Sequence, residues 1–71
     1  RSARGRADAV VKTPKYIYVF EFKLNGTAEQ ALQQIDDKGY LIPYLADGRE
    51  IVKAGVEFCA ETRNISRWLV E

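Results

Sequence analysis

The chain has 71 residues, 46% of them hydrophobic and 30% charged, with a formal net charge of +1, which is typical of one small globular domain and excludes a collagen-like, coiled-coil or disordered chain. It contains no histidine and one cysteine, Cys59, so histidine catalysis, histidine zinc sites and an internal disulfide are excluded within it, and a reducing cytoplasm is the expected compartment. The longest uncharged apolar run without proline, residues 16–20, is far too short to cross a bilayer, so we expect a single non-membrane domain over residues 1–71.

The first part of the chain is predicted to form a β-hairpin. Residues 8–12 make a short strand, Thr13-Pro14-Lys15 is a proline turn, and residues 16–24 (YIYVFEFKL) carry the strongest strand signal. The start of this second strand is apolar on both faces, as is typical of a central strand. If Thr13 and Tyr16 close the turn as a pair, the register places Asp8 directly opposite Glu21, on the same face of the sheet.

A helix is predicted to follow the hairpin. Asn25-Gly26 ends the strand, and Thr27-x-x-Gln30 has the form of a capping box, in which the two side chains satisfy free backbone donors at a helix start. Apolar residues then recur with helical spacing at Ala28, Ala31, Leu32 and Ile35. Gly39 suits a left-handed cap, so we expect the helix to end near Lys38.

Two further strands are predicted after the helix, over residues 51–59 and 64–70. Residues 40–45, which contain Pro43, give no clear prediction. The element order is ββαββ, and we expect an α/β (mixed α+β) domain with a four-stranded sheet and one helix on one face. A strand–helix–strand crossover predicts that residues 51–59 lie parallel to residues 16–24, with antiparallel outer neighbours. We expect the helix to cover the face of Tyr18, Phe20 and Phe22, because these rings have the greatest need of cover.

The chemically suggestive cluster is Asp8, Glu21 and Lys23, which share one face at one end of the sheet. Directly opposed carboxylates destabilise a sheet unless a cation lies between them. A divalent metal such as Mg²⁺ takes carboxylate oxygens and waters and binds substrate phosphates, and Lys23 could orient or deprotonate an attacking water or stabilise the transition state. This pattern favours phosphodiester hydrolysis. The alternative is a partly exposed ion-pair cluster in which Lys23 and Arg6 neutralise the two acids.

Four other polar positions have two interpretations each. Gln34, at the border of the helix's apolar face, could reach the end of the sheet or face solvent. Tyr40 could stack on a nucleobase or pack against the protein. Arg4 and Arg6 could contact nucleic-acid phosphates or belong to a basic terminus without a binding role.

Five short segments give the chain a resemblance to the C-terminal part of the PD-(D/E)XK nuclease superfamily, and more closely to a bacterial branch in which the nuclease-like domain follows an ATPase-like domain. They are GRAD at residues 5–8, VFEFKL at 19–24, ALQQI at 31–35, KGY at 38–40 and AGVEF at 54–58. The resemblance implies a restriction-endonuclease-like fold whose core begins with a helix and a strand that this sequence lacks, as a C-terminal fragment would.

The same resemblance implies roles for particular residues. Asp8 and Glu21 would bind Mg²⁺ or Mn²⁺, Lys23 would assist hydrolysis of a DNA phosphodiester, and Gln34 and Tyr40 would complete the catalytic set. The implied partners are DNA and an ATPase-like domain of the same parent chain. The alternative is a nuclease-like module that binds nucleic acid or protein without cleavage. The exposed edge of residues 8–13 could also pair with another chain as a homodimer.

Overall fold

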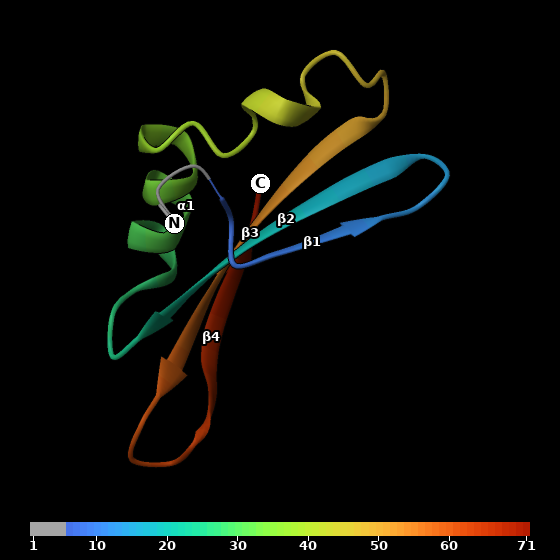
Figure 1. Cartoon of the computed structure of the whole chain (residues 1–71). Helices are drawn as coiled ribbons and strands as arrows, with labels where there is room; N and C mark the ends of the chain where they lie inside the picture. Colours follow the sequence, from blue (N-terminus) through green and yellow to red (C-terminus); the bar gives the residue numbers. More distant parts are fainter. Residues whose placement is uncertain (1–5) are drawn as a thin grey trace.

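The computed structural model describes residues 6–71, which form one sheet with a helix packed on it (Figure 1). The elements are β1 (Ala9–Lys12), β2 (Tyr16–Leu24), α1 (Ala28–Asp37), the 3-10 helix η1 (Ile42–Tyr44), β3 (Glu50–Cys59) and β4 (Asn64–Val70). The four strands found in this range lie in the order β1-β2-β3-β4, with β2 and β3 parallel and both outer pairs antiparallel. The predicted ββαββ order and mixed sheet are confirmed. Within the described residues, no helix is both long and apolar enough to cross a membrane.

The hairpin has the predicted register. The Thr13 backbone N–H donates to the Tyr16 carbonyl at 2.8 Å, and the Tyr16 N–H donates to the Thr13 hydroxyl at 2.9 Å. Ala9 consequently pairs with Phe20, and the next position outward sets Asp8 opposite Glu21. The turn chemistry of residues 13–16 therefore decides which side chains meet at the other end of the hairpin.

Helix α1 has the caps that its sequence predicts. The Gln30 N–H donates to the Thr27 hydroxyl at 3.0 Å, and the Thr27 N–H donates to the Gln30 side-chain oxygen at 2.9 Å, which completes the capping box. At the other end, Gly39 has a φ of 68°, a left-handed value that glycine adopts without steric cost. The chain then turns back, and the Tyr40 N–H donates to the Ile35 carbonyl at 3.1 Å.

The helix covers the opposite face of the sheet from the one we expected. Ile17 and Val19 of β2 pack with Leu32, Ile35 and Tyr40 in the core, so α1 lies over the face that also carries Glu21. The expectation that the rings at positions 18, 20 and 22 lie under the helix was wrong. The start of β2 is apolar on both faces, so hydrophobicity alone does not decide which side the helix takes.

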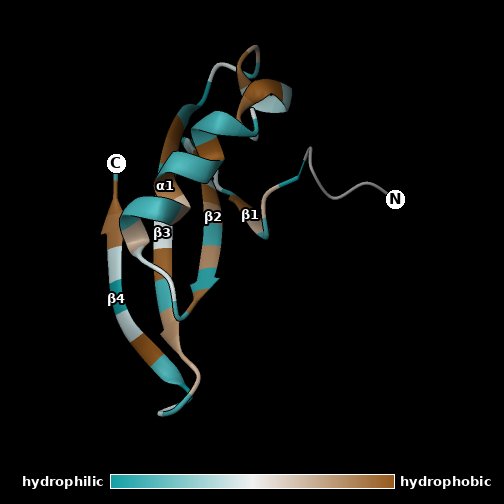
Figure 2. Ribbon diagram, turned by 90° about the vertical axis from the view of Figure 1, so that its left-hand side faces the viewer, coloured by the Kyte–Doolittle hydropathy of each residue, from teal (hydrophilic) through white to brown (hydrophobic). Residues whose placement is uncertain are grey.

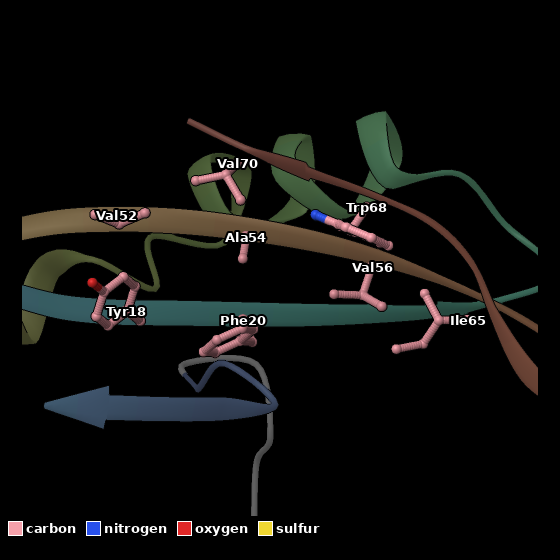
Figure 3. Close-up of a pocket in the computed structure, with 8 residues that line it drawn as sticks. All are labelled: Tyr18, Phe20, Val52, Ala54, Val56, Ile65, Trp68 and Val70. Carbon is pink, nitrogen blue, oxygen red and sulfur yellow. The ribbon is translucent and has the colours of Figure 1, made fainter.

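The aromatic face is open across the described residues. Its side chains surround a hollow of ≈ 330 Å³, and in Figure 3 the helix is seen behind the sheet. The lining residues are Tyr18, Phe20, Val52, Ala54, Val56, Ile65, Trp68 and Val70. Trp68 is 65% exposed and Val70 61% exposed. An exposed apolar surface that spans three strands is unusual in a protein whose sheet is packed on both faces.

Helix α1 approaches the sheet closely at Gly55 of β3, which pairs with Glu21 in the parallel register. A Cβ atom at Gly55 would lie 2.4 Å from the carbonyl oxygen of Ala28 and 3.0 Å from the Cβ of Ala31. Glycine in β3 and alanine in α1 thus let the two elements meet at short range. This close approach brings the polar residues of α1 within reach of the end of β2.

Candidate metal centre

Two carboxylates meet where β1 begins and β2 ends. Asp8 immediately precedes β1, and its backbone N–H donates to the Phe20 carbonyl at 3.1 Å. Its side-chain Oδ2 accepts the Phe22 backbone N–H at 2.9 Å. This second bond fixes the Asp8 carboxylate against β2, next to Glu21, and uses one of its two oxygens. The side chain is otherwise exposed to solvent.

Glu21 differs from Asp8 in being buried, with 5% of its surface exposed. Its Oε2 accepts a hydrogen bond from Gln34 Nε2 at 2.6 Å. Its Oε1 is fully buried and receives no hydrogen bond within residues 6–71. Burial, followed by the negative charge of Asp8, raises the pKa of Glu21 above its usual value, and Lys23 opposes this shift. When Glu21 is ionised, the negative charge on Oε1 is therefore not balanced by a hydrogen-bond donor from the described residues.

Gln34 connects the other residues of the site. Its side-chain nitrogen donates to Glu21 and to the Tyr40 hydroxyl, the latter at 3.0 Å, and its oxygen accepts from the Lys23 ammonium. Because Lys23 can only donate and an ionised Glu21 can only accept, the chemistry fixes the orientation of the amide. Gln34 thus reaches the end of the sheet, which was one of its two possible positions, and holds Lys23 beside Glu21.

The site suits a hard divalent cation. Mg²⁺ and Mn²⁺ prefer oxygen ligands, and two oxygens here could serve, the buried Glu21 Oε1 of β2 and the second oxygen of Asp8, just before β1. Across residues 6–71, no group of three or more acidic, histidine or cysteine side chains gathers here or elsewhere. Any further ligands would thus come from water or substrate oxygens, which is the usual manner of Mg²⁺ binding at phosphate-processing sites.

The ion-pair alternative does not describe this cluster. In the described part of the chain, the salt bridges involve other residues, and neither Asp8 nor Glu21 belongs to one. Lys23 bonds to the Gln34 oxygen instead of a carboxylate. Arg6 is exposed, without an ion pair to Asp8 or Glu21 among the described residues. Among the described residues, neither Lys23 nor Arg6 therefore forms an ion pair with the two acids.

The three residues expected to contact nucleic acid, Arg4, Arg6 and Tyr40, do not lie together on one described surface. Arg6 lies two residues before Asp8 on the exposed approach to β1, and Arg4 lies outside the described residues. Tyr40 is 5% exposed and its ring belongs to the core, so base stacking on this ring is excluded as its role. Its hydroxyl, which accepts from Gln34, is the part of the residue that belongs to the site.

Two contributors to the site were not foreseen from the sequence. The backbone N–H of Phe22 anchors Asp8, and no side-chain pattern reveals such a bond. Gly55 permits the close approach of α1, and here a signal existed, since an isolated glycine in a strand often marks close contact with another backbone.

Comparison with known proteins identifies the family of this chain. The family model described as the PD-(D/E)XK nuclease superfamily matches residues 1–68. The chain is also similar to an Azotobacter chroococcum mcd 1 protein described as "Uncharacterized protein in vnfD 5'region", with 42% identity over 72 residues. That alignment covers 99% of this chain and 14% of the relative, so the chain spans a small part of the relative's length. No solved structure matches the chain. The match over nearly the whole sequence, on a mixed sheet that sets Asp8 beside Glu21 and Lys23, places this chain in the PD-(D/E)XK nuclease superfamily.

Proposed function

We propose that this nuclease-like domain hydrolyses DNA phosphodiester bonds with a divalent cation, Mg²⁺ or Mn²⁺, held by Asp8 and Glu21. The observation that carries the proposal is the buried Glu21 oxygen, which lacks a hydrogen-bond donor among the described residues. It belongs to a side chain on which the charge of a second carboxylate, Asp8, also acts. Hydrogen-bond donors satisfy most buried carboxylate oxygens, so an oxygen left without one is well suited to a cation ligand.

The residues of the site have separate tasks in the proposed reaction. The bound cation would supply positive charge to the phosphate and acidify a water molecule. Lys23, whose ammonium donates to Gln34, would orient the attacking water or stabilise negative charge that develops on the phosphate oxygens. Gln34 keeps Lys23 and Glu21 in fixed relative positions, and Tyr40 supports Gln34 from the core. Asp8 and Glu21 would hold the cation.

The test is cleavage of end-labelled DNA by the unaltered chain with Mg²⁺ and with excess EDTA, beside three variants, Glu21→Gln, Asp8→Asn and Lys23→Gln. Loss of a group that acts in the transition state typically lowers the rate by about 10² to 10⁴, so each variant should lose at least about a hundredfold. Glu61→Gln and Lys15→Gln make the same charge changes at exposed positions in other turns and should keep full activity. Equal rates in all six proteins would contradict the proposal.

The second candidate function is a nuclease-like module that binds nucleic acid without cleaving it. The observation in its favour is that residues 6–71 supply two acidic ligands and no third. Saturable binding of Mn²⁺ and DNA by the unaltered chain, without cleavage of DNA or RNA, would support this candidate over the first. We also propose that an ATPase-like domain accompanies this module in a longer parent chain. The Azotobacter relative is long enough to contain such a domain, because the match covers 14% of it.

A further inference from the structure

A polar groove lies directly beside the candidate metal centre. Six side chains line it, and its volume is ≈ 420 Å³. They are Lys23, Gln30, Gln33, Gln34, Asp37 and Lys38. Lys23 comes from the end of β2, and Lys38 is the C-cap residue of α1. The other four side chains belong to α1, whose solvent side is hydrophilic in Figure 2. The groove therefore runs along α1, beside the end of β2.

The groove is continuous with the site because two of its residues belong to both. Lys23 and Gln34 line the groove and also form the hydrogen-bonded group around Glu21. A ligand that reached the carboxylates with one phosphate would thus lie with its next unit against α1. This continuity distinguishes the groove from the hollow on the aromatic face, which lies on the far side of the sheet.

The chemistry of the lining suits a flexible polyanion that is held without base-specific contacts. Lys23 and Lys38 supply two ammonium groups, and Lys38 forms no salt bridge within the described residues. The Gln30 oxygen is occupied by the Thr27 N–H, so its amide nitrogen remains as a donor. Amide and ammonium donors of this kind bind phosphate and sugar oxygens, which position a nucleic acid without reading its sequence.

Asp37 limits the affinity of the groove for an anion. Its carboxylate accepts a hydrogen bond from Gln33 at 2.8 Å and lies in the lining next to Lys38. A phosphate near Lys38 would be repelled by Asp37, so the two residues act in opposite directions on the same ligand. Substitution of Lys38 should therefore weaken anion binding and substitution of Asp37 should strengthen it, a pair of effects not expected if these residues only stabilised the fold.

We propose that this groove binds the sugar–phosphate backbone of the substrate strand beside the phosphodiester that is cleaved, with Lys38 as a phosphate contact. The inference rests on the proposed function, since it assigns a place to the substrate of that site. It concerns binding alone, so it can be tested separately from cleavage.

The experiment measures binding of a fluorescent oligothymidylate by anisotropy, in EDTA and over a range of salt concentrations. For single strands, the slope of log K against log[salt] changes by about 0.7 for each phosphate contact. Lys38→Gln should therefore weaken binding several-fold and flatten the slope by about 0.7, while Asp37→Asn should strengthen binding. The matched controls Lys15→Gln and Glu61→Gln make the same charge changes at exposed sites in other turns and should alter neither quantity.

The outcomes separate this inference from the proposed function. Binding that depends on Lys38 without any cleavage would support the groove and contradict hydrolysis. Cleavage that requires Glu21, with Lys38→Gln and Lys15→Gln equal in affinity and slope, would support hydrolysis and overturn the groove. No binding by the unaltered chain at the lowest salt concentration would also overturn it. Repeating the titration with a duplex shows whether the bound strand must be single.

Discussion

The carboxylate of Glu21 lies between the sheet and α1 with 5% of its surface exposed, and one of its oxygens receives no hydrogen bond from residues 6–71. Burial of an unsatisfied, charged group destabilises a fold, so this residue has a structural cost that metal binding would offset. Its position opposite Asp8 could be predicted from residues 13–16, because the turn fixes the register. The bond from Phe22 that anchors Asp8 could not, since it depends on backbone direction.

Glu21→Gln should therefore stabilise the metal-free chain. The substitution keeps the side-chain shape, removes the charge and gives the buried end a donor. An unsatisfied buried polar group costs about 1–3 kcal/mol, and we expect a gain within that range in the free energy of unfolding, measured by urea denaturation at pH 7 in EDTA. Glu61→Gln, at an exposed turn, should change little. A less stable Glu21→Gln protein would contradict the claim that the buried Glu21 carboxylate destabilises the metal-free fold.

Gln34→Leu should weaken the site without removing a ligand. The substitution deletes the bonds to Glu21, Lys23 and Tyr40 and keeps similar bulk. Residues that orient metal ligands typically contribute 10- to 100-fold to metal affinity, and we expect a loss in this range for Mn²⁺ by isothermal titration calorimetry. Gln33→Leu, the exposed neighbour on α1, is the control. Equal affinities for the two variants would mean that Gln34 does not orient Glu21.

At the scale of elements, the bounds of β2 and β4, the caps of α1 and the parallel crossover could be predicted, because local turn chemistry and hydrophobic period determine them. The face that α1 covers could not be read from β2, where Ile17 and Val19 compete with larger rings on the other side. Gly55 helps to explain the outcome, since α1 lies so close over this residue that a Cβ atom there would meet the helix backbone. The lack of a side chain at this position of β3 leaves room for α1 on this face of the sheet.

Gly55→Ala should separate α1 from the sheet. The added Cβ would lie 2.4 Å from the backbone oxygen of Ala28, so the helix itself must shift. Overpacking of this kind typically costs about 1–3 kcal/mol, and we expect a lower melting temperature together with weaker Mn²⁺ binding, because Gln34 moves with the helix. Ser66→Ala, at an exposed position of β4, is the control. An unchanged melting temperature would show that the close approach of α1 to β3 at Gly55 does not contribute to stability.

An acidic cluster at the start of α1 should make stability depend on pH. Glu57 accepts the Ala28 N–H at 2.8 Å, and Arg67 pairs with both Glu57 and Glu29. The Arg67 guanidinium lowers the pKa of Glu29 to about 2, and the Ala28 N–H followed by Arg67 lowers the pKa of Glu57. Depressed carboxyl pKa values stabilise the fold above the usual pKa of 4.5 and lose this effect as the pH falls toward 2.

Arg67→Gln should accordingly lower the melting temperature at pH 7 and leave it nearly unchanged at pH 2. The difference between the two proteins should also shrink at high salt, because exposed ion pairs are screened. Arg63→Gln, in the turn before β4, is the control with the same charge change. A constant difference between pH 7 and pH 2 would contradict the role given to Glu29 and Glu57.

On the scale of the whole molecule, the two faces of the sheet differ in character. One face carries α1, the core and the candidate metal centre, and the other is apolar and open across residues 6–71 (Figure 3). The sequence indicated a domain rich in apolar strand residues. Whether those residues are buried or exposed depends on what packs against them, and strand periodicity does not show this. Pairing of the β1 edge with a second chain stays a prediction.

The open face predicts the behaviour of the single tryptophan. Trp68 is 65% exposed, so its fluorescence should be quenched by acrylamide nearly as well as that of free tryptophan. The measurement is a Stern–Volmer titration of the dilute native chain, with the urea-unfolded chain as reference. Strong protection of Trp68 in the native chain would show that this face is covered in solution.

The central claim is that Asp8 and Glu21 form one cation site, and Mn²⁺ binding followed by electron paramagnetic resonance tests it most directly. We predict that the unaltered chain binds Mn²⁺ saturably, that Mg²⁺ competes, and that Asp8→Asn and Glu21→Gln each weaken the affinity at least about tenfold while Glu61→Gln does not. Equal Mn²⁺ affinity in all four proteins, or no saturable binding by the unaltered chain, would contradict the claim.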